Sequence, residues 1–230
     1  MSVTVGHAMR MGANLSPPVI QALASDASDV SGNSIFTNIG VTTRVDGLVV
    51  VAARCNGDRA STMTPSVGTF IGSMTGITTH AVGFSGGSAG GTLLLWSGWA
   101  SNFAGSVGTT WSSNSAGRAV STMLVTGASG VVQAQLGAGS TSGTTYSVTL
   151  PSTPARTSLL IGAITAQDTG GITPTTVFAF GAVDELHDLI AGTDRALETQ
   201  AVIIPGSVTV SWGDLTDGLR RRGAVIEVAS

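Results

Sequence analysis

Hydrophobic and polar residues alternate along several short segments of the chain. Residues 146–150 (YSVTL) and 224–228 (AVIEV) place an apolar side chain at every second position. This period of two matches the alternation of side chains across a half-buried β-strand. Clusters such as SGGSAGG (85–91) and PSTPAR (151–156) separate such segments, and their Gly, Ser and Pro residues favour tight turns. The pattern predicts an all-β fold of strands joined by turns.

Two other segments are apolar throughout. They are GLVVVAA, residues 47–53, and SLLIGAI, residues 158–164. Continuous apolar runs of this length fit strands that are covered on both faces. We therefore expect both segments to be central strands.

The chain contains two similar halves. Similar patterns recur in the same order, which predicts two diverged copies of one unit of about 100 residues. We expect the two repeats, 19–129 and 131–230, to form a single β-sandwich domain of two antiparallel sheets, because paired edges escape exposure. Residues 1–18 have no counterpart and form an N-terminal arm. The matching pairs are 19–36 with 131–147, 45–58 with 156–169, and 109–125 with 210–228.

One segment has a helical pattern. In residues 183–192 (VDELHDLIAG), Val183, Leu186 and Ile190 follow helical spacing and Gly192 is a stop signal. The corresponding place in the first repeat has no such pattern. Helix and strand therefore both remain open for this segment.

The chain is poor in charge. It has 230 residues, of which 42% are hydrophobic and 10% charged, against about 25% charged in ordinary soluble domains. This composition can build a core and is unlike that of disordered chains. Lysine is absent, which excludes a phosphate-binding P-loop lysine and Schiff-base chemistry. The net charge of −3 argues against a nucleic-acid partner.

The cysteine content and the apolar runs limit the cellular setting. The single cysteine, Cys55, excludes an internal disulfide and a cysteine-rich zinc site, and its position at the end of an apolar run predicts a buried thiol. No run reaches about 18 apolar residues and the N-terminus lacks a signal core, so we expect no membrane insertion and synthesis in the cytosol.

The stretch VGFSGGSAGG, residues 82–91, matches G-x-S-x-G around Ser85 and again around Ser88. A nucleophile elbow needs a strand, a sharp turn and a helix, but the following residues read as a strand. The one histidine after Ser88, His187, has its nearest acids beside it in sequence, which leaves no room for separate triad loops. We expect a flexible hairpin loop and no catalytic residue, with a hydrolase as the weakest alternative.

Acidic residues and a histidine gather in residues 184–188. Asp184, Glu185, His187 and Asp188 could offer metal ligands, but a charge cluster beside a turn is typical of a solvated surface. We expect no metal and no cofactor.

The four tryptophans form two pairs, for which we expect different roles. Trp96 and Trp99 are three residues apart, so on a regular strand they face opposite sides, and the outward ring could stack on a sugar or a partner chain. They are the candidate binding residues. Trp111 and Trp212 occupy equivalent repeat positions, which predicts that both are core residues.

The N-terminal arm contains the candidate assembly residues. Val3 and Val5 alternate as in a strand, and Met9 and Met11 supply adaptable apolar surface. We expect the arm to dock on an adjacent subunit or on another protein. The alternative is an edge strand of its own sandwich.

Three segments resemble the virion structural proteins of tailed bacteriophages, a group of minor tail, tail-appendage and accessory head proteins. They are DGLVVVAA (46–53), GTLLLWSGWA (91–100) and SSNSAGRA (112–119). The resemblance lies in the order of strand-like and Gly/Ser-rich segments and in composition, and it extends over nearly the whole chain. It implies a jelly-roll or lectin-like β-sandwich.

The same resemblance implies a non-enzymatic role in a virion assembled in the host cytoplasm. The expected protein is a minor tail or appendage protein that mediates assembly or surface adhesion. Its expected partners are other virion proteins, further copies of the chain and a possible host surface glycan. Two alternatives are a capsid decoration protein, and a carbohydrate-binding module or lectin outside a virus that would use Trp96 or Trp99.

Overall fold

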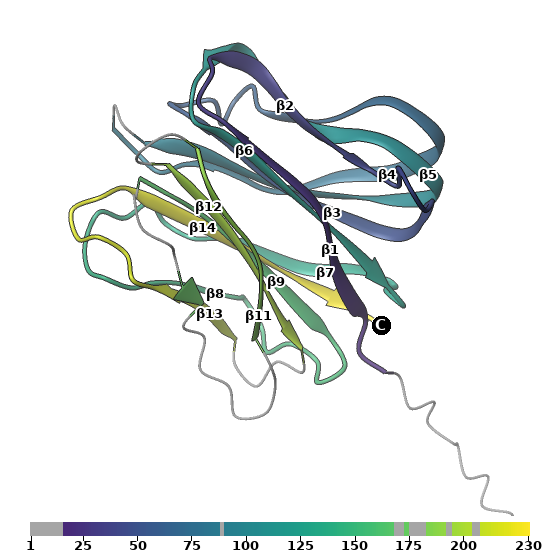
Figure 1. Cartoon of the computed structure of the whole chain (residues 1–230). Coiled ribbons are helices and arrows are strands. Elements are labelled where there is room, and N and C mark those ends of the chain that lie inside the picture. Colours follow the sequence, from purple (N-terminus) through teal and green to yellow (C-terminus); the bar gives the residue numbers. More distant parts are fainter. Residues whose placement is uncertain (1–15, 88–89, 168–172, 175–182, 192–194, 204–207) are drawn as a thin grey trace, which may run out of the picture.

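The computed structural model describes residues 16–87, 90–167, 173–174, 183–191, 195–203 and 208–230. The regular secondary structure in this part of the chain consists of β-strands alone, and all paired strands run antiparallel. The predicted all-β class is confirmed. The strands form three sheets (Figure 1).

The first sheet contains the first six strands and is curled. Its order is β1-β6-β3-β5-β2, and β4 pairs with β5. The long β5 pairs with β3 through residues 91–103 and with β2 through residues 105–115, so the sheet bends along this strand. The strands are β1 (Val19–Ser28), β2 (Gly32–Ile39), β3 (Val45–Asn56), β4 (Thr64–Phe84), β5 (Gly91–Ser115) and β6 (Arg118–Thr126).

The remaining strands form a second sheet of five strands and a third sheet of three. The second sheet has the order β11-β12-β9-β14-β7 and the third has the order β10-β13-β8. In Figure 1 the second sheet lies below the first, with β8 and β13 beneath it. The strands are β7 (Gly130–Leu136), β8 (Tyr146–Thr149), β9 (Leu159–Ala166), β10 (Thr173–Pro174), β11 (Val183–Ile190), β12 (Ala196–Ile203), β13 (Thr209–Gly213) and β14 (Arg221–Ala229).

Three hydrophobic cores hold the sheets together. The central core lies between the first and second sheets and includes Val50 of β3 and Ile161 of β9. The curled core is enclosed by the first sheet alone and includes Trp96 and Phe103. The outer core lies between the second and third sheets and includes Trp212.

The strands β3 and β9 are buried on both faces. Along β9 every side chain is buried, and along β3 residues 48–55 are buried. Alternate residues of each strand enter different cores: Val50 faces the central core and Val51 the curled core. The expectation from the two apolar runs is confirmed. The expected pair of sheets is extended by a third sheet and by the curl of the first, because a strand covered twice needs a layer on each side.

The segment with helical spacing is a strand. Residues of β11 pair with β12 from Val183 opposite Val202 to Ile190 opposite Ala196, with a bulge between Glu185 and His187. The bulge adds one residue to the alternation. Leu186 and Leu189, three positions apart, therefore both pack against the central core. This spacing imitates one turn of a helix.

Candidate functional site

The glycine-rich stretch forms the turn between β4 and β5. Ser85 is buried, and its Oγ accepts a hydrogen bond of 3.0 Å from the Gly91 main-chain N–H. Gly86 and Gly87 have φ values of 101° and 63°, which favour glycine. Ser88 lies outside the described residues. The expectation of a hairpin turn is confirmed, but Ser85 is an internal residue of it rather than an exposed one.

This turn packs against the second half of the chain. Arg222 Nη1 donates a 2.6 Å hydrogen bond to the Phe84 carbonyl. The Arg220 guanidinium packs on Gly87: a Cβ added there would lie 2.1 Å from Cζ of Arg220, so any other residue would displace this side chain and would also strain the positive φ. The loop therefore joins the two halves of the molecule, and Ser85 lies buried within it.

Both described histidines contact serines other than Ser85. His80 Nε2 lies 2.8 Å from Ser97 Oγ, and His187 Nδ1 lies 2.7 Å from Ser121 Oγ. Burial lowers the pKa of each imidazole below its ordinary value. Ser121 is fully buried between the first and second sheets, so the Ser121–His187 pair is closed to a substrate.

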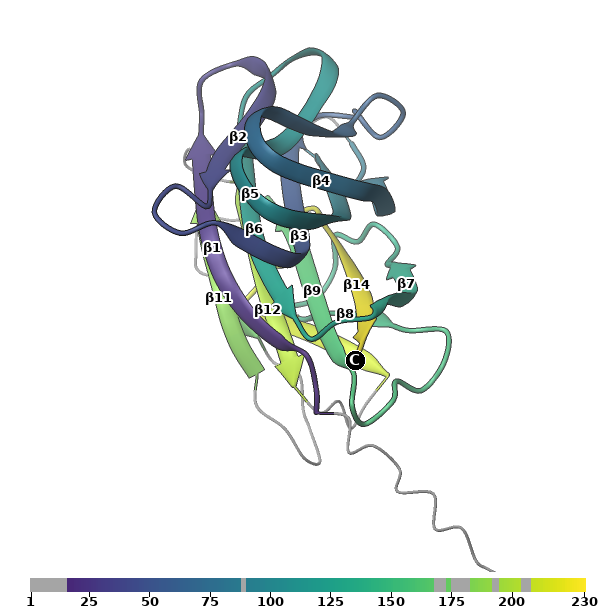
Figure 2. The same ribbon diagram turned by 90° about the vertical axis from the view of Figure 1, so that its right-hand side faces the viewer.

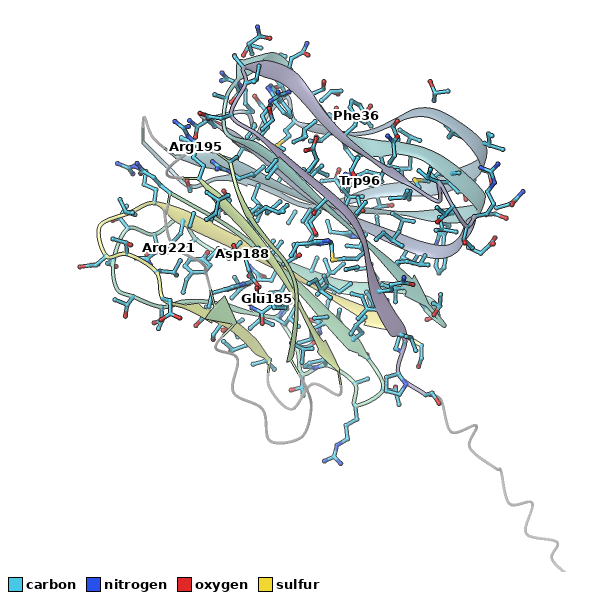
Figure 3. The ribbon with its side chains drawn as sticks, viewed as in Figure 1. Phe36, Trp96, Glu185, Asp188, Arg195 and Arg221 are labelled. Atoms are coloured by element: carbon cyan, nitrogen blue, oxygen red, sulfur yellow. The ribbon has the colours of Figure 1, made fainter. Side chains whose placement is uncertain are left out.

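Acidic residues of β11 lie next to a buried carboxyl group on the neighbouring strand β12, and two of them, Glu185 and Asp188, are labelled in Figure 3. Asp188 stands opposite Glu198 in the strand pairing, and Glu198 is fully buried. Burial, together with the negative charges of Glu185 and Asp188, raises the pKa of Glu198 well above its ordinary value. Within the described residues, no three His, Cys, Asp or Glu side chains are placed to hold a metal ion.

The tryptophans lie where their spacing and their repeat positions predict. Trp96 is fully buried in the curled core, whereas Trp99 is 36% exposed. Of this pair only the Trp99 ring is accessible to a surface ligand, because the Trp96 ring is enclosed in the curled core. Trp111 and Trp212 are both buried, which confirms them as core residues.

The single cysteine is a core residue. Cys55 is fully buried in the curled core, and burial raises its pKa to about 11. The expectation of a buried thiol is confirmed. The candidate assembly residues Val3, Val5, Met9 and Met11 lie outside the described residues.

A surface pocket of about 510 Å³ opens beside β1. It is lined by Gln21 and Leu23 of β1, by residues 38–45 around the turn from β2 to β3, and by Leu124 of β6. Arg44 is the one ionisable residue in this lining. Nothing in this lining selects a particular ligand.

Sequence reasoning missed an uncharged, apolar edge on β4. No strand within the described residues pairs with the side of β4 that faces away from β5. Phe70, Ile71 and Ile77 on this strand are 47%, 59% and 45% exposed. The signal that could have found this edge is the charge pattern, because residues 60–117 contain no Asp, Glu, Lys or Arg.

In the described part of the chain, no helix has the length and apolar character needed to cross a membrane. Comparison of the chain with protein-family models, with curated proteins and with solved structures gave no match in any of the three.

Proposed function

We propose that the chain is a fused pair of diverged jelly-roll units. A jelly roll folds eight strands into two facing sheets. In the first half, β1-β6-β3-β5 forms one layer, while β2, the second part of β5 and the first part of β4 form the other. In the second half, β7-β14-β9-β12 and β8-β13-β10 follow the same order. The agreement of pairing order supports the duplication.

Details within the strands support the same proposal. Arg118 and Arg221 each begin the last strand of their half, and each donates to a main-chain carbonyl near the second strand, at Ser34 and at Gly143. The register bulge between Thr79 and Ala81 in β4 recurs between Glu185 and His187 in β11. The recurrence of both features at corresponding positions supports descent of the two halves from one unit.

The contacts across the central core support a pseudo-two-fold relation between the units. The strand β1 lies against β11, and β4 lies against β7 (Figure 2). In pairing order β1 corresponds to β7 and β4 to β11. Exchanging the two units therefore exchanges these two contacts.

We propose that the protein is a non-enzymatic structural component of a tailed-phage virion, as a minor tail or appendage protein that mediates assembly or surface adhesion. The observation that carries this proposal is the uncharged β4–β5 hairpin with its exposed apolar edge. Exposed, flat, apolar edges promote association, and proteins that stay separate usually guard them with charge. The resemblance of three sequence segments to virion proteins supplies the setting.

Two other functions have specific support. A capsid decoration protein would use the same edge at another place in the virion. A carbohydrate-binding module or lectin would use the exposed ring of Trp99.

Quantitative mass spectrometry of purified virions tests the proposed function. We expect the protein at a fixed whole number of copies per particle. Its absence from particles, together with a signal on a glycan array that is lost in Trp99→Ala, would favour the lectin. Deleting residues 1–16 tests the arm: incorporation into particles should be lost while the β-rich circular dichroism and a cooperative melt persist. A truncated chain that unfolds would assign the arm to the core.

A further inference from the structure

We propose that two copies of this chain associate through the β4 edge about a two-fold axis. The β4 edge is defined as Phe70, Ile71, Met74 and Ile77, which lie on the long strand Thr64–Phe84. The inference rests on the proposed assembly function and names the partner of that surface. Three properties of the edge support it.

The first property is that the β4 edge continues the curled core to the surface. The ring of Phe70 stacks on that of the buried Phe103, with centroids 5.6 Å apart and an interplanar angle of 23°. Met74 and Ile77 lie together over Gly98, where an added Cβ would meet Met74 Cγ at 3.0 Å and Ile77 Cγ1 at 3.3 Å. Met74 also packs against the curled core. Phe70, Met74 and Ile77 are therefore the open end of a core rather than scattered surface residues, and Ile71 lies beside them in sequence with 59% of its surface exposed.

The second property is the difference between β4 and its counterpart β11. By strand register, Thr78, Thr79, Ala81 and Val82 correspond to Asp184, Glu185, His187 and Asp188. Each strand pairs on one side only within the described residues. Charged side chains are a usual means of protecting an edge strand. Over these corresponding positions β11 carries charged side chains, whereas β4 carries none anywhere along residues 64–84.

The third property is electrostatic and favours a second copy as the occupant. The chain has a net charge of −3, but residues 60–117 contribute no Asp, Glu, Lys or Arg. Two copies can therefore meet through this hairpin without like-charge repulsion. An antiparallel edge is self-complementary about a two-fold axis, which is the commonest symmetry of homodimers.

The register of β4 limits how its edge can pair. It shifts between Val67 and Phe70, Ile71 and Ser73, Thr75 and Thr78, and Thr79 and Ala81. These bulges interrupt the row of main-chain groups. We expect apolar side-chain contacts with short stretches of strand pairing, rather than a continuous ladder along the whole strand.

Sedimentation velocity of the full-length chain tests the proposal. We expect a dimer, and we expect the double variant Ile71→Lys and Ile77→Lys to raise the dissociation constant by roughly 100-fold or more, because like charges would face each other across the axis. The matched control is Val132→Lys on β7, where the native side chain is 60% exposed. This control should remain dimeric. Circular dichroism should show the same β content in all three proteins.

A cross-linking experiment keeps the test independent of the lysine variants. Ser73→Cys on β4 should give a covalent dimer with a short bis-maleimide, whereas Ser147→Cys on β8 should not. Both positions are exposed and the native Cys55 is buried. The result identifies which surface lies at the axis.

Several outcomes would overturn the proposal. They are a monomeric wild-type chain, a double lysine variant that dimerises as the wild type does, dissociation of the Val132→Lys control, or equal cross-linking at positions 73 and 147. A monomeric chain that is nevertheless a stoichiometric virion component would leave the proposed function standing. A dimer that is absent from virions would refute the proposed function and leave the dimer standing.

Discussion

Two buried glutamates of the second half have different hydrogen-bond surroundings. Glu227 is 4% exposed and accepts hydrogen bonds from Gln133 Nε2 at 2.5 Å and from the Ala155 main-chain N–H at 2.9 Å. Glu198 is fully buried on β12, and among the described residues only the Trp212 side chain is close enough to interact with its carboxyl group as a donor, without the geometry of an ordinary hydrogen bond. Burial disfavours the charged form of a carboxyl group. The pKa of Glu198 is therefore raised despite the Trp212 contact.

We predict that Glu198→Gln removes a pH dependence of stability. The folded chain binds a proton at Glu198 that the unfolded chain releases at its ordinary pKa, so the unfolding free energy falls as pH rises from that value toward the raised pKa. The slope is about 1.4 kcal/mol per pH unit. The lowered pKa values of His80 and His187 act in the opposite sense, reducing stability as pH falls below about 6.5.

Denaturant unfolding between pH 4 and pH 8 gives the unfolding free energy of wild type and of Glu198→Gln, and the difference between the two values at each pH measures this effect. The histidine contributions are the same in both proteins and cancel. A difference that does not change with pH would contradict the raised pKa.

We predict that Ser85→Ala destabilises the protein without affecting any hydrolase chemistry. The substitution removes the acceptor of the Gly91 N–H, at a cost of about 1–2 kcal/mol for a buried group. Thermal melts measure the loss, and Ser113→Ala at an exposed position of β5 is the control. A fluorophosphonate probe should label neither protein. Stoichiometric labelling that disappears in Ser85→Ala would refute the structural role.

At the scale of elements, periodicity predicted the strands and their burial but could not predict their partners. The apolar runs in β3 and β9 correctly indicated cover on both faces. The curl of the first sheet depends on β5 changing partners from β3, 35 to 58 positions away in sequence, to β2, 66 to 83 positions away, and pairings this distant leave no local signal. The bulge in β11 placed two apolar residues three positions apart on the same face, so the sequence of this strand also fitted a helix. Periodicity could not identify the β4 edge, because a strand is an edge only when no second strand pairs with it, and strand partners are not encoded locally. Within the described residues β4 pairs with β5 alone.

We predict parallel effects for the two arginines that begin β6 and β14. Arg118→Ala and Arg221→Ala each remove a charged donor to a main-chain carbonyl, which costs about 1.5–3 kcal/mol. The loss should be larger at Arg221, which is 1% exposed. Arg156→Ala, at an exposed turn position, is the control and should change stability by less than about 0.5 kcal/mol. Denaturant midpoints compare the three variants, and a neutral effect at both strands would argue against equivalent roles.

At the scale of the whole molecule, the central core makes the two halves one folding unit. Both halves contribute to it: Leu48, Val50 and Leu95 come from the first, and Ile161 and Ile226 from the second. Neither half covers this face alone. The glycine-rich turn adds polar contacts across the same boundary.

We predict that residues 19–129 expressed alone are aggregated or unfolded. Without the second sheet, the central-core face of the first sheet is exposed to water, and such a face promotes association. Solubility after expression and circular dichroism melts measure the outcome. The matched control is residues 16–230. A soluble half with a cooperative melt would contradict the prediction.

The position of β14 in the second sheet has a consequence for synthesis on the ribosome. This strand, Arg221–Ala229, is the last in the chain, yet it lies between β9 and β7. The second sheet cannot close, and the first sheet cannot be fully covered, until residues 221–229 have emerged from the exit tunnel. Pairings this distant in sequence are slow to form, and a nascent chain with an uncovered apolar face needs chaperones. A chain that stops before residue 221 lacks this inner strand, so we expect premature termination to yield unfolded material for proteolysis rather than a folded, shortened protein.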